Sequence, residues 1–262
     1  MSAPLRIVVI YPDLLGTYGD GGNGLILARR AQWRGVDSDL VYAPSDAAVP
    51  EGDIYCLGGG EDGPQVRAAH GLIDDGTLVR RVQGGATVLA VCAGYQIVGE
   101  RFAGSDGSAH DGVGLLAMTT VKGTGTRAVG EVTADLNPDA FSALGIAPAS
   151  GFPTLSGFEN HGGVTTLAQG TIPLASVRSG IGNGDGSGTE GALDGRVVGT
   201  YLHGPVLARN PVLADLVLSW ALDVDMATLG VLDDDAHEAL RRERLEAVAP
   251  TARRRVLGRR GN

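Results

Sequence analysis

A cysteine at the end of an apolar run is the residue best placed to do chemistry. Cys92 follows Thr87 to Val91 and precedes Ala93 to Gln96, a pattern typical of a strand that turns sharply into a helix. Small residues leave the sulfur accessible, and the positive end of the helix dipole favours the thiolate. We therefore predict that Cys92 is a nucleophile. Cys56, inside the apolar run Asp53 to Leu57, has the pattern of a buried core residue.

A thiol nucleophile needs a base, and His203 is the histidine whose setting matches that of Cys92. It directly follows the apolar run Val197 to Leu202 and precedes Gly204. Parallel strands bring their carboxyl ends to one edge of a sheet, so the two residues can meet although they lie far apart in the chain. We predict that His203 relays protons to and from Cys92.

Three glycines follow the apolar run Asp53 to Leu57, and glycine lets a backbone approach a substrate closely. We predict that the N–H groups of Gly59 and Ala93 stabilise the oxyanion that forms when the Cys92 thiolate attacks a carbonyl group. A triple glycine considered alone is equally consistent with a simple turn.

Short β-branched runs alternate with helical patterns toward both ends of the chain. The alternation predicts an α/β fold with a mostly parallel sheet and helices on both of its faces. The expected strands are Leu5 to Tyr11, Asp39 to Tyr42, Asp53 to Leu57, Ala86 to Val91 and Arg196 to Leu202. The expected helices are Gly24 to Arg34, Gln65 to Ile73, Leu78 to Gln83, Tyr95 to Arg101 and Pro211 to Leu222.

The middle of the chain, residues 104 to 195, has a different pattern. Glycine, threonine and valine alternate there in short pieces, which predicts antiparallel hairpins and long loops. Within it, the glycine- and aspartate-rich stretch 179 to 194 predicts a mobile, solvated loop.

The charge balance excludes several classes of protein. The chain of 262 residues has a formal net charge of −9, and its single lysine, Lys122, is not in the Gly-Lys-Ser/Thr context of a phosphate-binding loop. The acidic body, with basic residues concentrated over 241 to 262, indicates a poor binder of nucleic acid. Two cysteines, no signal peptide and no membrane-length apolar run predict a cytoplasmic protein.

We expect one domain over residues 1 to 225 and a helical, basic C-terminal tail over residues 226 to 262. An amphipathic pattern from Ala236 to Val248 precedes the arginine cluster at 253 to 255. This tail is either a docking helix or a frayed terminus, and the second interpretation is slightly favoured.

Several blocks together resemble a known family, and the main ones are Gly58-Gly59-Gly60, Cys92-Ala93-Gly94-Tyr95-Gln96 and Tyr201-Leu202-His203-Gly204-Pro205. The sequence resembles the class I glutamine amidotransferases of the cobyric acid synthase-like (CobB/CobQ-like) branch. Two further blocks, Tyr18 to Asn23 and Gly157 to Gly163, make it most similar to the stand-alone glutaminase subunits of lipid II isoglutaminyl synthases. The matching blocks lie within about residues 5 to 222.

The resemblance implies a flavodoxin-like three-layer glutaminase domain, in which Cys92 forms a γ-glutamyl thioester, ammonia leaves and His203 relays the protons. It also implies that Arg127 binds the glutamine substrate, and an arginine fork suits a carboxylate. The sequence alone would favour a solvated loop arginine. Asp20 matches a family aspartate that assists the site, and a turn formed by Asp-Gly is the competing explanation. His161 lines the site or satisfies loop backbone groups, and we leave it outside the catalytic set.

One position departs from the wider superfamily, whose catalytic histidine is followed two residues later by a glutamate. Pro205 occupies that position here. The third group that orients His203 must come from elsewhere, or the site works as a dyad. The cobyric acid synthase-like branch shares this departure.

The resemblance further implies a partner protein. Amide formation from a carboxylate needs activation, and the chain has no recognisable ATP site. In the family that the sequence resembles, ammonia passes to a MurT-type, Mur-ligase-like synthetase that uses ATP, forming a heterodimer. That partner amidates the α-carboxylate of D-glutamate in the stem peptide of lipid II, at the membrane surface, during peptidoglycan biosynthesis. Neither a metal nor an organic cofactor is implied.

Three alternatives remain open. A cobyrinate-type amidotransferase would carry a fused ATP-binding domain ahead of the glutaminase, whereas only four residues precede the expected first strand here. A catalytically silent binding subunit is disfavoured by the presence of Cys92, His203 and Gly59. A redox or chaperone-type cysteine protein on a related fold would not need Arg127.

Overall fold

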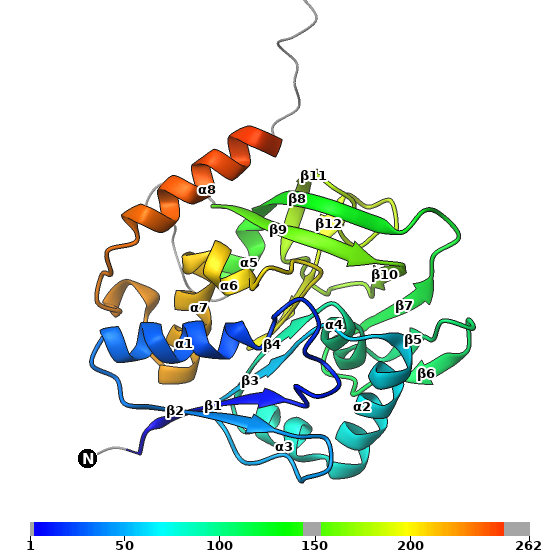
Figure 1. Cartoon of the computed structure of the whole chain (residues 1–262), viewed down its shortest axis with the longest axis horizontal. Helices are drawn as coiled ribbons and strands as arrows, with labels where there is room; N and C mark the ends of the chain where they lie inside the picture. The colour runs from blue at the N-terminus through cyan, green and yellow to red at the C-terminus, as the bar shows by residue number, and fades with distance from the viewer. Residues whose placement is uncertain (1–2, 144–152, 249–262) are drawn as a thin grey trace, which may run out of the picture.

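A six-stranded sheet forms the centre of the fold in the computed structural model, which describes residues 3–143 and 153–248 (Figure 1). Its strands are β1 (Leu5–Ile10), β2 (Ser38–Ala43), β3 (Ile54–Leu57), β4 (Thr87–Val91), β13 (Ala192–Asp194) and β14 (Val197–Thr200). Their order is β13-β14-β4-β3-β1-β2, and each neighbouring pair is parallel except β13 with β14. The predicted mostly parallel sheet is confirmed.

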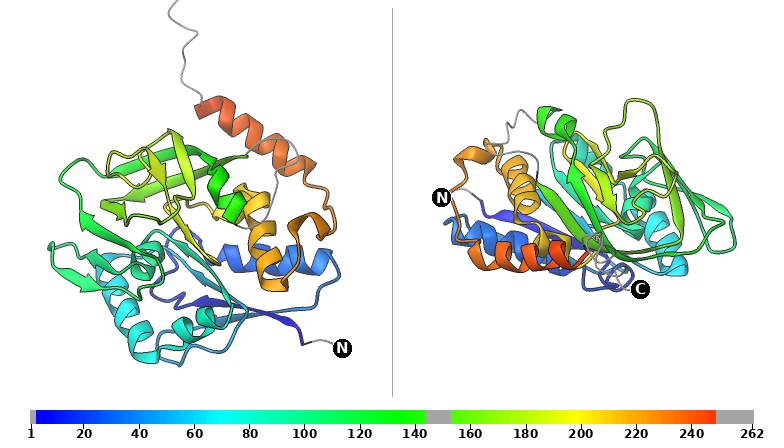
Figure 2. Two further views of the ribbon diagram at one scale, coloured as in Figure 1. Left: turned by 180° about the vertical axis from the view of Figure 1, so that it is seen from behind. Right: turned by 90° about the horizontal axis from the view of Figure 1, so that it is seen from above.

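Helices cover both faces of this sheet, which gives the expected three layers. Above it in Figure 1 lie α1 (Gly22–Trp33) and α7 (Pro211–Leu222), which contact each other. Below it lie α2 (Asp62–Asp75) and α3 (Thr77–Gln83), and the short α4 (Ala93–Val98) packs against α2. Figure 2 shows the same arrangement from behind and from above.

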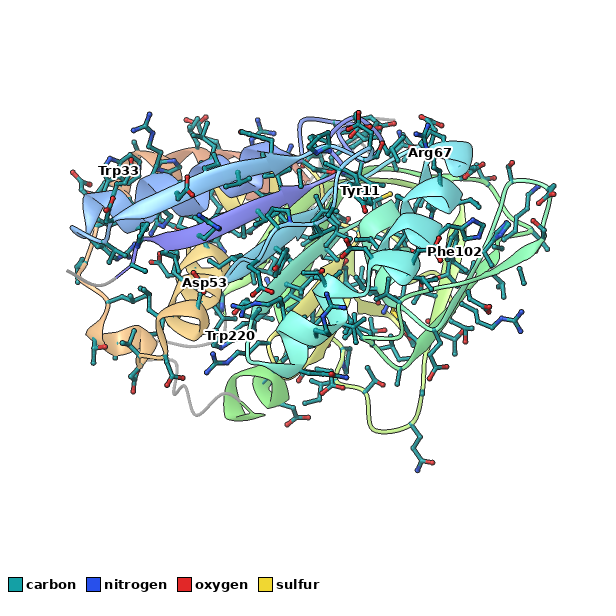
Figure 3. All side chains as sticks on the ribbon, turned by 90° about the horizontal axis from the view of Figure 1, so that it is seen from below. Tyr11, Trp33, Asp53, Arg67, Phe102 and Trp220 are labelled. Carbon is teal, nitrogen blue, oxygen red and sulfur yellow. The ribbon has the colours of Figure 1, made fainter. Side chains whose placement is uncertain are left out.

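Burial on both faces explains why the central strands are so apolar. Every residue of β3, β4 and β14 is buried, as expected for parallel strands covered by helices. Figure 3 shows all side chains seen from below, with Trp220 of α7 and Trp33 at the end of α1 labelled. Trp220 is 7% exposed and Trp33 is 61% exposed.

Two smaller sheets lie beside the central one, as the pattern of residues 104 to 195 predicted. One has the order β10-β7-β5-β6, and its strands are β5 (Arg101–Ala103), β6 (Ala109–Asp111), β7 (Met118–Lys122) and β10 (Gly163–Leu167). The other is antiparallel with the order β12-β11-β8-β9, and its strands are β8 (Ala128–Leu136), β9 (Thr154–His161), β11 (Ala175–Ser179) and β12 (Thr189–Glu190).

The structure corrects two local expectations. The helix expected to run from Tyr95 to Arg101 ends at Val98, because Gly99 turns into extended backbone and Arg101 begins β5. The stretch 179 to 194 is the expected solvated loop only in part: residues 185–188 are exposed, whereas Thr189–Glu190 and Ala192–Asp194 form strands. Asn183 and Glu190 within it are fully buried, and burial raises the pKa of Glu190 to about 7.

The C-terminal part of the described chain packs back on the body. It contains α6 (Val206–Arg209), the 3-10 turn Met226–Thr228 and α8 (Asp235–Val248), while α5 (Pro138–Ala143) lies earlier in the chain. The helix α8 contacts β8 and α6. The predicted helix is confirmed, the division at residue 225 stays a prediction, and the arginine cluster 253–255 lies outside the described residues. Within residues 3–143 and 153–248, no helix combines the length and hydropathy of a membrane span.

An arginine of α1 joins three helical segments. The Arg30 guanidinium is almost fully buried and binds Asp215 of α7 at 2.8 Å and Asp234, just before α8, at 2.7 Å. Burial opposes the charge of Arg30, but hydrogen bonds to Asp234 and Asp215 outweigh it and raise the pKa of the guanidinium. We infer that this cluster fixes the start of α8 to the body.

Replacing Arg30 by alanine should lower stability strongly. Breaking a buried ion pair costs about 3–5 kcal/mol, and we expect the lower end because Asp215 and Asp234 keep some contact with water. Thermal unfolding of Arg30→Ala measures the loss. The matched control is Arg6→Ala, whose exposed pair with Asp39 contributes at most about 1 kcal/mol. Equal melting temperatures for the two variants would contradict the role of Arg30.

Candidate active site

Cys92 lies in a strained turn between β4 and α4. Its φ of 52° and ψ of −105° are values that residues other than glycine rarely adopt. The backbone is held there from both sides: the Cys92 N–H donates to the Thr200 carbonyl at 2.8 Å, and the Gln96 N–H donates to the Cys92 carbonyl at 3.0 Å. The turn places the Cys92 side chain at the wall of a cavity, as the sequence pattern predicted.

Gly94 explains how α4 can begin so close to β3. A Cβ atom at this position would stand 2.7 Å from Cβ of Leu57 and 2.9 Å from its carbonyl oxygen, which is shorter than real contacts allow. The Gly94 N–H donates to the Gly58 carbonyl at 3.1 Å, which joins the two turns. Glycine is therefore required here by close backbone approach.

His203 is almost fully buried, with 1% of its surface exposed, and its ring is held by a carboxylate. Nδ1 lies 2.8 Å from Oδ2 of Asp20, and the other ring nitrogen, Nε2, has no hydrogen-bond partner among the described residues. An Nδ1–H donated to Asp20 leaves Nε2 as the atom that can exchange a proton with a thiol.

Asp20 is the group that orients His203, in place of the glutamate that the wider superfamily has at the position of Pro205. Its side chain is fully buried, and Oδ2 also accepts the Gly59 N–H at 2.9 Å. The turn interpretation holds as well, since the Asp20 carbonyl accepts the Asn23 N–H at 3.0 Å. The structure thus joins Asp20 directly to His203, and the pairing of Val91 with Thr200 brings Cys92 to the same edge of the sheet.

The environment of His203 changes its proton affinity. Burial alone would lower its pKa, because an imidazolium is poorly solvated there. The hydrogen bond to Asp20 and the nearby Asp20 and Cys92 groups outweigh burial and raise the pKa of His203 from 6.5 to about 9. The stability that protonated His203 contributes is therefore complete below pH 6.5 and is lost as pH rises through about 9.

Gly59 does not point its N–H into the cavity as expected for an oxyanion donor, since that N–H is bound to Asp20. Its neighbour Gly60 lines the cavity together with Ala93. Ala93 is the first residue of α4, so its N–H has no acceptor within the helix. The substrate-binding role of Gly59 stays a prediction. The structure also shows that glycine leaves room for the His203 ring, because a Cβ atom at position 59 would stand 2.7 Å from Cε1 of His203.

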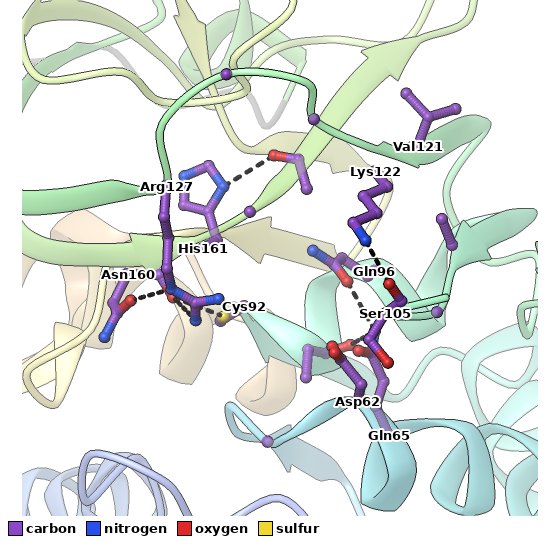
Figure 4. Close-up of a pocket in the computed structure, with 18 residues that line it drawn as sticks. Asp62, Gln65, Cys92, Gln96, Ser105, Val121, Lys122, Arg127, Asn160 and His161 are labelled. Carbon is purple, nitrogen blue, oxygen red and sulfur yellow. Dashed lines mark hydrogen bonds between the residues drawn. The ribbon is translucent and has the colours of Figure 1, made fainter. Parts of the chain in front are cut away.

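The cavity beside Cys92 has a volume of about 260 Å³. This lies just below the roughly 300–1,000 Å³ of pockets for drug-sized ligands, and it suits a molecule of amino-acid size. Arg127 lines it and is exposed to solvent, with its Nε donating to Oδ1 of Asn160 at 2.5 Å. Figure 4 shows Arg127 and Asn160 on one side of Cys92, with Gln96 and Lys122 on the other.

Several lining residues were missed in the sequence. Gln65 Nε2 donates to Oε1 of Gln96 at 2.8 Å, and Gln96 Nε2 donates to the Tyr201 hydroxyl at 3.1 Å, so a buried amide chain forms part of the cavity wall. A glutamine on an amphipathic helix gives no signal for such a role. Asn160, by contrast, lies in the block Gly157 to Gly163, whose match to the family already marked this segment as important.

His161 combines the two interpretations that the sequence left open. It lines the cavity, its Nδ1 lies 2.9 Å from the Gly163 carbonyl, and its ring stacks on that of Tyr201 at 3.7 Å. A ring fixed in this way serves as a wall of the cavity.

The fold and this site define a class I glutamine amidotransferase. Two solved structures from Thermotoga maritima share the fold. PurLQS has a TM-score of 0.56 and 16% identity over 84% of this chain and 99% of that one. A glutamine amidotransferase has a TM-score of 0.52 and 14% identity over 92% of this chain and 94% of that one. At these identities the likeness concerns the fold alone.

Sequence similarity identifies the family of the chain more narrowly than the fold does. The CobB/CobQ-like glutamine amidotransferase domain matches residues 6–211, and the chain belongs to that family. It is 33% identical to the lipid II isoglutaminyl synthase (glutamine-hydrolyzing) subunit GatD of Streptococcus pneumoniae, over 83% of this chain and 80% of that protein. The GatD subunit of Staphylococcus aureus is also 33% identical, over 84% and 85%. The resemblance found in the sequence is confirmed.

Replacing Asp20 by asparagine should lower the pKa of His203. The charge and strong acceptor on Nδ1 are lost, and such a partner accounts for about 1–3 pKa units. NMR titration of the His203 Cε1 proton, assigned with His203→Gln, measures the change. Asp62→Asn is the matched control, because Asp62 lines the cavity but does not act on His203. An unchanged titration in Asp20→Asn would refute the assigned contact.

Proposed function

We propose that the chain hydrolyses glutamine through Cys92. His203 Nε2 takes the thiol proton, and the thiolate attacks the γ-carboxamide carbon. The C–N bond then breaks, and His203 returns the proton to the leaving ammonia. Water, activated by His203, cleaves the resulting γ-glutamyl thioester to glutamate and restores the thiol. The observation that carries the proposal is the contact of buried His203 with Asp20, at the same edge of the sheet as the Cys92 turn.

The oxyanion of each tetrahedral intermediate needs donors near Cys92. We assign the Ala93 N–H to this role, with Gly60 as its partner because Gly60 lines the cavity and the Gly59 N–H is bound to Asp20. Asp20 keeps the His203 tautomer fixed through both proton transfers.

Arg127 is proposed to bind the α-carboxylate of glutamine. It lines the cavity, and in Figure 4 the end of its side chain lies between Asn160 and Cys92. A guanidinium recognises a carboxylate through two parallel hydrogen bonds, which would orient the substrate as well as hold it.

We further propose that the chain is the glutaminase subunit of a lipid II isoglutaminyl synthase. The support is its similarity to the two GatD subunits over most of their length. Ammonia would pass to a MurT-type, ATP-dependent partner in a cytoplasmic heterodimer, which amidates the α-carboxylate of D-glutamate in the lipid II stem peptide. An enclosed path would protect the ammonia from protonation.

A cobyrinate-type activity is the second candidate. The cobyric acid synthase of Azorhizobium caulinodans is 36% identical, but over only 62% of this chain and 30% of that protein. The greater coverage of the GatD subunits favours the lipid II reaction.

Replacing Cys92 by alanine should abolish ammonia release from glutamine. The thioester cannot form without the sulfur, so the expected loss is complete within detection, both for the chain alone and with a MurT-type partner. Ammonia and glutamate are measured together. Cys56→Ala is the control, since Cys56 is buried in β3 away from the cavity. Substantial residual release by Cys92→Ala would remove it as the nucleophile.

Replacing Arg127 by alanine should raise KM for glutamine with a smaller change in kcat. Losing charge-assisted hydrogen bonds costs about 1.5–3 kcal/mol, or roughly 10- to 150-fold in KM. Steady-state glutaminase kinetics measure this. Arg178→Ala, which removes an exposed arginine bound to Asp135, should leave KM unchanged. A KM near the wild-type value in Arg127→Ala would identify Arg127 as a solvated loop residue.

A further inference from the structure

Asn160 lies where β9 approaches the beginning of β8. Val129 of β8 pairs with Asn160, and Arg127 is two residues earlier, just before that strand. Side chains two residues apart in extended backbone point to the same side, so Arg127 and Asn160 are diagonal neighbours on one face. The β8–β9 register therefore places the amide beside the guanidinium.

Asn160 binds one edge of this guanidinium with two acceptors. Its side-chain Oδ1 accepts from Arg127 Nε at 2.5 Å, and its backbone oxygen accepts from Nη2 at 3.1 Å. An arginine has five N–H groups in a planar fork. The Nε–Nη2 edge is therefore occupied, whereas the opposite edge, formed by Nη1 and Nη2, has N–H groups that bind none of residues 3–143 and 153–248 and can bind a carboxylate.

Further contacts fix Asn160 itself in the site. Its Nδ2 donates to the Tyr18 hydroxyl, and the Tyr18 ring lies edge-on to the His203 ring at 4.9 Å. The Asn160 backbone oxygen also lies 4.0 Å from the Cys92 sulfur. The residue that holds Arg127 is thus at a fixed distance from the proposed nucleophile.

We propose that Asn160 is a positioning residue for substrate recognition: it binds the Nε edge of Arg127 and so turns the Nη1–Nη2 edge toward the α-carboxylate of glutamine. This rests on the proposed function. The proposal assigns a role to the block Gly157 to Gly163, which contains Asn160 and neither of the proposed reacting residues, Cys92 and His203. Without the Oδ1 acceptor, the exposed Arg127 side chain would sample other rotamers and present its fork less often.

The test uses alkylation of Cys92 by 6-diazo-5-oxo-L-norleucine, a glutamine analogue that keeps the α-carboxylate and loses N₂ when the thiolate bonds to its terminal carbon. Mass spectrometry of the intact full-length chain follows the reaction and does not require turnover. Iodoacetamide, which lacks an α-carboxylate, reports the reactivity of the thiol itself.

In Asn160→Ala, the half-saturating concentration of the analogue should rise about tenfold, the effect of one hydrogen bond to a charged group. Iodoacetamide should react within about twofold of the wild-type rate. Asn137→Ala, which removes an amide hydrogen bond to the Pro173 carbonyl, should change neither rate. Unchanged half-saturation in Asn160→Ala would overturn the proposal.

A double-mutant cycle identifies the route of the effect. If Asn160 acts through Arg127, Asn160→Ala should have less than a twofold effect when Arg127 is already alanine. Additive losses would overturn the proposal. So would Tyr18→Phe if it raised half-saturation as much as Asn160→Ala, because the effect would then run through the Tyr18 hydroxyl. A wild-type chain whose Cys92 is not alkylated by the analogue would instead refute the glutaminase function itself.

Discussion

A single buried carboxylate oxygen holds the site together. Oδ2 of Asp20 accepts from both His203 and Gly59, so one atom joins the turns that follow β1, β3 and β14. With the Cys92 turn after β4, all four turns lie at the carboxyl edge of the parallel sheet. This edge is where doubly wound folds place their ligands.

The two kinds of sheet carry different parts of the site. Turns of the parallel sheet hold the proposed reacting groups, whereas Arg127 and Asn160 belong to the antiparallel β8–β9 pair. The isolated bridge between Phe158 and His203 connects them through two backbone hydrogen bonds, at 2.9 and 3.2 Å. The residues proposed to bind substrate and those proposed to transfer protons are therefore connected through the backbone and not only through side chains.

The parts of the fold that repeat a simple pattern could be predicted from the sequence. Apolar runs ending in Cys92 and His203 indicated both the parallel sheet and the edge where they meet. The contact between Asp20 and His203 could not be predicted, because residues 183 positions apart are joined by topology and no local periodicity encodes it. The direction of the Gly59 N–H could not be predicted for a similar reason, because it depends on the position of Asp20. Asn183 and Glu190 are buried because tertiary packing overrides a composition that is typical of loops.

Gly59 has a consequence for how the chain tolerates mutation. A Cβ atom there would stand 2.7 Å from Cε1 of His203 and 3.2 Å from Oδ2 of Asp20. Alanine would therefore push the imidazole away from its carboxylate. In a survey of all single substitutions, position 59 should lose function as completely as a residue with a reacting side chain, although glycine has none. A position can therefore be sensitive to substitution because it lies against His203 and Asp20, even though its own side chain takes part in no reaction.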